Sequence, residues 1–121
     1  MKISVTPVPA PRMTKRDRWA RRPAVIRYFE YRDVLKSAWG EREVPERLRL
    51  KFVMPIPKSW SNKKRLLMEG KPHQQKPDID NLQKAVQDSL CDDDSYIYDV
   101  CATKVWGIDG SVTIETLTGE E

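Results

Sequence analysis

Cysteine, histidine and glycine are among the scarcest residues of this sequence, with 2 cysteines, 1 histidine and 5 glycines in 121 residues. Cys91 and Cys101 stand too far apart and too alone for a zinc motif, and His73 has no second histidine to form a His-rich zinc site. A Ser-His-Asp triad is equally disfavoured. We therefore expect both cysteines to be small core residues without a disulfide, and His73 to be exposed in a loop.

Long apolar runs are also missing. No stretch is long enough to cross a bilayer, and the first residues lack the apolar segment and cleavage site of a signal peptide. We therefore expect a cytoplasmic protein with no membrane partner. A chain of 121 residues has room for one modest core, so residues 1–121 predict a single domain.

Positive charge slightly exceeds negative charge, with 22 basic and 18 acidic residues. This balance favours a polyanionic partner. The densest basic run is residues 12–22, which surrounds Trp19 with Arg12, Lys15, Arg16, Arg18, Arg21 and Arg22. Guanidinium groups can pair with phosphates and an indole can stack on a base, but a solvated loop has the same composition. Both interpretations remain open here.

The first third of the chain predicts one strand and one helix. Polar and apolar residues alternate over residues 2–6, as in a half-buried strand, and Pro7 ends the pattern. Residues 23–39 predict a helix, because Pro23 suits a first turn and Gly40 suits a C-terminal cap. We expect the apolar face of this helix to contain Ile26, Phe29, Val34, Leu35, Ala38 and Trp39.

The middle of the chain contains the clearest strand pattern, over residues 47–54. The apolar residues Leu48, Leu50, Phe52 and Met54 alternate with the basic residues Arg47, Arg49 and Lys51. A sheet with one solvated face explains this alternation without any partner. Residues 59–69 then predict a short helix in a polar connection, whose basic residues Lys63, Lys64 and Arg65 could contact a DNA backbone.

The last part of the chain predicts an amphipathic helix and two strands. Residues 78–91 place Ile79, Leu82, Val86 and Leu90 on one helix face. Residues 95–106 and 111–117 predict strands joined by a turn at 107–110. The order strand-helix-strand-helix-strand-strand indicates an α/β (α+β) fold, a mixed sheet with helices packed on it. We expect the helix at 78–91 to pack against the last hairpin.

Aspartates gather at both ends of that helix. Asp78 can cap it and Asp80 lies in its first turn, where the dipole favours negative charge, and Lys84 is spaced to pair with Asp80. This explanation does not extend to Asp92–Asp94, because negative charge opposes the dipole at the far end. If the chain turns back along the helix, one of these carboxylates can join Asp78 and Asp80 in a site for Mg²⁺. Such a site would suit phosphodiester hydrolysis.

These residues resemble a known family. The segment Asp78-Ile79-Asp80-Asn81-Leu82-Gln83-Lys84-Ala85 resembles the Asp-x-Asp-Asn-Leu-x-Lys-Ala motif of the RusA family of Holliday junction resolvases, and Asp93-Asp94-Ser95-x-Ile97 resembles its Asp-Asp-x-x-Ile/Val element. The similarity continues through Asp99 and Lys104, and residues 9–13 are similar to the family's Pro/Arg-rich segment. Residues 13–75 match only in size and element order.

The resemblance implies a Mg²⁺-dependent homodimer that resolves four-way junctions by paired symmetric nicks in DNA recombination and repair, with no small-molecule cofactor. It implies Asp78, Asp80 and Asp94 as catalytic, metal-binding carboxylates, with Asp93 as a further possible ligand, and Lys84 as the active-site lysine. Expected DNA contacts come from Arg12, Lys15, Arg16, Arg18, Arg21, Arg22, Lys63, Lys64, Arg65 and Lys76.

Three other functions compete with this one. A nuclease for forks or flaps would share the same metal site, because the site hydrolyses a phosphate whatever geometry delivers it. A junction-binding protein that does not cut would share the basic segments. A small interaction protein would use the acidic residues only as helix caps, and would show no affinity for DNA.

Overall fold

A four-stranded mixed sheet forms the body of the chain in the computed structural model, which describes residues 1–11 and 22–117. The strands are β1 (Lys2–Ile3), β2 (Arg47–Pro55), β3 (Asp99–Gly107) and β4 (Ser111–Thr116), in the spatial order β1-β4-β2-β3. β2 is parallel to β3 and antiparallel to β4. The predicted α+β fold with a mixed sheet is confirmed.

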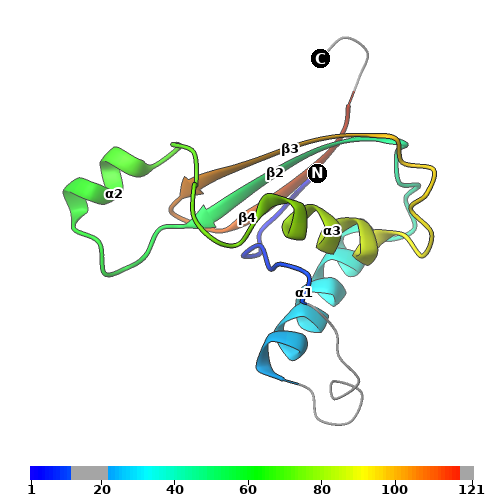
Figure 1. Ribbon diagram of the computed structural model, residues 1–121, viewed down its shortest axis with the longest axis horizontal. Helices are drawn as coiled ribbons and strands as arrows, with labels where there is room; N and C mark the ends of the chain where they lie inside the picture. The colour runs from blue at the N-terminus through cyan, green and yellow to red at the C-terminus, as the bar shows by residue number, and fades with distance from the viewer. Residues whose placement is uncertain (12–21, 118–121) are drawn as a thin grey trace.

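Three helices accompany the sheet: α1 (Pro23–Trp39), α2 (Asn62–Met68) and α3 (Ile79–Leu90). α1 and α3 pack against each other and share the apolar core with the sheet, whereas α2 projects from the far end of β2 (Figure 1). Ser61 caps α2, because its hydroxyl oxygen accepts a hydrogen bond from the Lys64 backbone N–H at 3.2 Å. Within the described residues, no helix is long and apolar enough to cross a membrane.

The alternation in β2 is confirmed. Leu48, Leu50 and Phe52 are fully buried against the helices, and Arg49 and Lys51 are exposed on the opposite face. This register follows from the two-residue period of a strand, which places alternate side chains on opposite faces. The buried face of β2 therefore anchors the core to which α1 and α3 attach.

The expectation that the last two strands form a hairpin is wrong. β2 lies between β3 and β4 and forms hydrogen-bonded ladders with both of them. All nine residues of β3 pair with β2, from Arg47 opposite Asp99 to Pro55 opposite Gly107. A long-range parallel pairing has thus replaced the local one, and α3 contacts α1 and β3 rather than a hairpin. The first strand is also shorter than expected, ending at Ile3.

The buried face of α1 is also displaced from the expected one. The buried residues of α1 are Val25, Tyr28, Tyr31, Leu35 and Trp39. Of these, only Leu35 and Trp39 belong to the predicted apolar face. Ile26 and Val34 are 46% and 43% exposed. The helix has little contrast between its faces because tyrosines and aliphatic residues surround it, so packing against α3 rather than hydropathy decides its orientation.

The expected positions of one cysteine and of the histidine are wrong. Cys101 is exposed because it shares its face of the sheet with Arg49, its partner in β2. His73 is 6% exposed, because its backbone pairs with β3 and its ring contacts Trp106 at a centroid distance of 4.2 Å. Residues next to charged neighbours in the sequence are therefore not necessarily on the surface.

Candidate active site

Residues 70–73, which we call the edge segment, continue the sheet beyond β3. Gly70 and His73 donate backbone hydrogen bonds to the carbonyl oxygens of Trp106 and Lys104, and the Trp106 N–H donates to Lys71. Pro72 forms an antiparallel bridge with Val105. This pairing covers the outer edge of β3 and brings the chain toward the start of α3, with four residues left between His73 and Asp78.

The start of α3 presents two aspartates. Asp78 occupies the N-cap position, but its carboxylate forms no capping hydrogen bond; instead it accepts two hydrogen bonds from the Lys76 ammonium, at 2.9 and 3.1 Å. Asp80 lies in the first turn. Within the described part of the chain, the Asp80 side chain has no hydrogen bond or ion pair. Its carboxylate oxygens are therefore available to a ligand.

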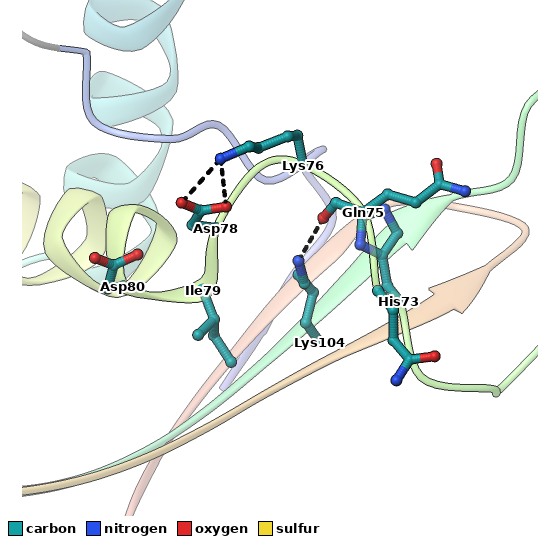
Figure 2. A pocket seen from close by; sticks show the side chains of 8 residues that line it. His73, Gln75, Lys76, Asp78, Ile79, Asp80 and Lys104 are labelled. Atoms are coloured by element: carbon teal, nitrogen blue, oxygen red, sulfur yellow. Dashed lines mark hydrogen bonds and ion pairs between the residues drawn. The ribbon is translucent and has the colours of Figure 1, made fainter.

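Both aspartates line one pocket at the junction of α3, β3 and the loop of residues 74–77, which we call the α3 pocket (Figure 2). It has a volume of about 810 Å³ and is open to solvent. Its lining consists of His73, Gln74, Gln75, Lys76, Asp78, Ile79, Asp80 and Lys104. Carboxylates and ammonium groups thus share a wide, accessible depression, which suits a polyanionic substrate better than a small apolar ligand.

The wall of this pocket contains a buried imidazole. His73 has no hydrogen-bond partner for Nδ1 among the described residues. Burial and the nearby Lys104 charge lower the pKa of His73 below its ordinary value, since both disfavour the imidazolium form. His73 is therefore neutral near physiological pH and adds no charge to the pocket.

The third predicted carboxylate lies elsewhere. Asp94 is half-buried after the C-terminal end of α3, where it accepts a hydrogen bond of 3.2 Å from the Gln87 amide. Gln87 in turn accepts one of 3.0 Å from Gln83. The chain thus turns back along α3, as the sequence argument required, but Asp94 is tied to the second half of the helix and does not line the α3 pocket.

Lys84 and Asp93 also lie outside the lining of the α3 pocket. Lys84 forms an ion pair with Asp88 at 3.1 Å, not the expected pair with Asp80, and this hydrogen-bonded carboxylate raises the pKa of Lys84. Asp93 accepts a hydrogen bond from the Ser95 N–H, and hydrogen bonding by Ser95 lowers the pKa of Asp93. Among the described residues, no three Asp, Glu, His or Cys side chains form a group ready to hold a metal ion.

The predicted DNA contacts divide into four groups. Arg12, Lys15, Arg16, Arg18 and Arg21 lie outside the described residues. Lys63, Lys64 and Arg65 are on the projecting helix α2, where the Lys64 ammonium lies 4.0 Å from the centre of the Trp60 ring. Lys76 lines the α3 pocket beside Asp78. Arg22 is the N-cap residue of α1. The described basic side chains among these contacts therefore occupy three places, which are α2, the α3 pocket and the start of α1.

Two residues that line the α3 pocket, His73 and Lys104, were not predicted from the sequence as site residues. His73 was expected to be exposed, and Lys104 was noted only as part of the family resemblance. One signal was present: a lysine interrupts the apolar alternation of Val100, Ala102 and Trp106. A charged residue at such a position requires a polar partner nearby.

The comparison with protein families agrees with the acidic motifs. The family model described as Endodeoxyribonuclease RusA matches residues 4–116, which include both motifs and all three helices. No curated protein and no solved structure gives a significant match to the chain. Since the family model covers nearly the whole sequence, the chain belongs to the RusA endodeoxyribonucleases, a family of Holliday junction resolvases.

Proposed function

We propose that this protein is a Mg²⁺-dependent, homodimeric endonuclease that resolves four-way DNA junctions by paired nicks. One observation carries the proposal: Asp78 and Asp80 line the same open pocket as Lys76 and Lys104. Family membership supports an endonuclease acting on branched DNA, and such nucleases typically need a divalent metal. The identity of the metal, the dimer and the role in recombination and repair belong to the proposal.

The donor set of the α3 pocket fits Mg²⁺. This ion takes one or two carboxylates, keeps several waters and accepts substrate phosphate oxygens as further ligands. Asp80 is unpaired within the described residues, and Asp78 is held only by Lys76, whose side chain is 85% exposed. A bound cation would replace that lysine at little cost, because exposed ion pairs contribute about 0 to 1 kcal/mol.

Each residue then has a distinct task. Asp78 and Asp80 would hold the cation, which would supply Lewis acidity toward phosphate oxygens and favour deprotonation of water. Lys76, once displaced from Asp78, would be free to contact the DNA backbone. We assign Asp94, which follows α3, as the third metal-binding carboxylate, with Asp93 as the alternative to it. We assign Lys84, on α3 itself, as the active-site lysine. The products would carry 5′-phosphate and 3′-hydroxyl ends.

The dimer explains why nicks should come in pairs. Two α3 pockets related by a two-fold axis match the two-fold symmetry of a junction cut on opposing strands. The basic residues of α2 and of residues 12–22 would supply phosphate contacts to the arms of the junction. Binding should therefore weaken steeply as salt is raised, because each contact releases counterions from the DNA.

The decisive experiment compares a labelled four-way junction with linear duplex of the same sequence, in Mg²⁺ or in EDTA. Paired nicks on the junction alone, only with Mg²⁺, are the expected result. Equal cutting of forks or flaps would replace junction resolution by a broader branched-DNA activity. Binding of the junction without cutting under any divalent metal would overturn the catalytic proposal and leave a binding protein.

A further inference from the structure

Lys104 stands at a core-facing position of an edge strand. It pairs in register with Phe52, which is fully buried, so the two side chains leave the sheet on the same face. Its neighbours on that face of β3 are Ala102 and Trp106. An ammonium group on an apolar face is costly unless it is hydrogen-bonded. The lysine must therefore have partners that compensate for its partial burial.

Those partners are backbone carbonyls of the loop before α3. The Lys104 ammonium donates to the carbonyl oxygens of Gln75 and Pro77, each at 2.7 Å (the bond to Gln75 is drawn in Figure 2). The backbone carbonyl of Lys104 also accepts a 3.0 Å hydrogen bond from the His73 N–H. Lys104 thus holds the chain at three residues, the last of them immediately before Asp78.

The loop of residues 74–77 has little else to hold it. Within the described residues, none of its backbone N–H groups donates a backbone hydrogen bond. Among the described residues, its other side-chain contact is the exposed ion pair between Lys76 and Asp78, for which a cation would compete. Hydrogen bonds from a charged donor are short and roughly twice as strong as neutral ones. Lys104 is therefore the main restraint on the loop.

We propose that Lys104 is a positioning residue that orients Asp78 and Asp80 for metal binding by holding the Gln75 and Pro77 carbonyls. The carboxylates project from the point where the held loop becomes α3, so displacement of the loop displaces Asp78 directly. Ligand groups must be held within about 0.5 Å of their productive geometry for full function. This role rests on the proposed function, because it assumes that the two carboxylates bind a cation.

The test uses three variants of the full-length protein. Lys104→Met removes the ammonium and keeps an apolar stem, and Lys104→Arg retains donors for two carbonyls. Lys51→Met is the matched control, because Lys51 lies on the neighbouring strand β2 but on the exposed face, so it loses the same charge without touching the loop. Thermal unfolding identifies any variant that fails to fold.

Two measurements are made on each variant. The first is Mn²⁺ affinity by electron paramagnetic resonance without DNA. We expect Lys104→Met to bind about 10- to 100-fold more weakly, as is typical when groups that orient metal ligands are removed. The second is amide hydrogen exchange without metal at His73 and Leu82, whose N–H groups are hydrogen-bonded on either side of the loop; exchange there should be faster in Lys104→Met only. Lys104→Arg should recover most of both properties, and Lys51→Met should match the wild type in both.

The outcomes separate this inference from the proposed function. If Lys104→Met binds Mn²⁺ as tightly as the wild type, Lys104 does not position the ligands and the inference is overturned. If the wild type binds Mn²⁺ nowhere and cuts no junction, the proposed function fails and the metal role of Lys104 fails with it. Unchanged hydrogen exchange in a folded Lys104→Met would overturn the restraint on the loop itself. If Lys104→Met does not fold, the same exchange experiment is made on Lys104→Arg. Exchange much faster than in the wild type would then contradict the inference.

Discussion

The two ends of α3 carry the same kind of residue in different settings. At the N-terminal end, Asp78 and Asp80 are exposed, face the α3 pocket and benefit from the helix dipole. Toward the C-terminal end, Asp94 is half-buried and hydrogen-bonded to Gln87, and Lys84 is paired with Asp88. At the first end, carboxylate oxygens are accessible to a cation. At the second end, Asp94 and Lys84 already have partners within the protein.

This difference shows what a ligand would have to change. A carboxylate with no internal partner can offer either oxygen to a cation, whereas Asp94 already accepts the Gln87 amide at Oδ2 and has only Oδ1 free of that bond. Under the proposed function, joining the two ends into one catalytic group would require Asp94 to reach the α3 pocket while Gln87 orients its carboxylate.

Asp80→Asn should have the largest effect on activity. We expect junction cleavage to fall by at least about a hundredfold, because the variant loses metal-dependent stabilisation of several kcal/mol and each 1.36 kcal/mol is a factor of ten. Junction binding should be retained, since removing a negative charge does not oppose DNA. Asp109→Asn, in the turn between β3 and β4, is the control. Cleavage by Asp80→Asn at the control rate would remove Asp80 from the site.

Leu82→Ala tests the buried face of the same helix. Leu82 is fully buried, so its truncation should lower the free energy of unfolding by about 2 to 5 kcal/mol in urea titrations. Ile79→Ala is the matched comparison, because Ile79 lies on α3 with 36% exposure and should cost much less. Equal losses for the two variants would contradict the packing of α3 on the core.

Gln87→Ala sharpens the contrast at the C-terminal end. It removes the hydrogen bond to Asp94, and loss of a group that orients a ligand typically costs about 10- to 100-fold in metal affinity or activity. We expect cleavage at low Mg²⁺ to be about 10-fold slower than in the wild type. Gln83→Ala removes only the bond between the two glutamines and should be milder. A Gln87→Ala enzyme with wild-type kinetics would exclude Asp94 as a ligand that Gln87 orients.

The smallest effect concerns pH and His73. Because the folded state lowers the pKa of His73 from its ordinary 6.5, the unfolded chain binds the proton more readily. The resulting stability is complete above pH 6.5 and is lost as pH falls through the lower, folded pKa. His73→Phe, which keeps a ring against Trp106, should reduce the drop in melting temperature between neutral and acidic pH. Parallel pH profiles for both proteins would show that this histidine is not the cause.

Local patterns predicted the elements well. The alternation in residues 47–54 and the apolar spacing of Leu82 and Val86 identified β2 and α3, because side-chain periodicity is a property of a few consecutive residues. The short helix α2 was also expected within residues 59–69. In α1, where apolar residues surround the helix, the same reasoning chose a face that includes the exposed Ile26 and Val34.

The candidate site was predictable only in part. The spacing of Asp78 and Asp80 indicated the two carboxylates that the α3 pocket brings together, since both lie within one helical turn. The position of Asp94 beside Gln87 and the pairing of Lys84 with Asp88 could not be read from spacing. Each residue had several partners within reach, and the path of the chain after α3 decided among them.

By itself, the sequence determined the acidic motifs, the alternating strand and the helix that carries the catalytic candidates, because these depend on residue type and local period. Only the tertiary structure decided that β2 separates β3 from β4, that His73 is buried, and that Lys104 holds the loop before Asp78. Those features join segments far apart in the chain. Their formation depends on which edge and which carbonyl a segment meets after folding, and no local pattern contains that information.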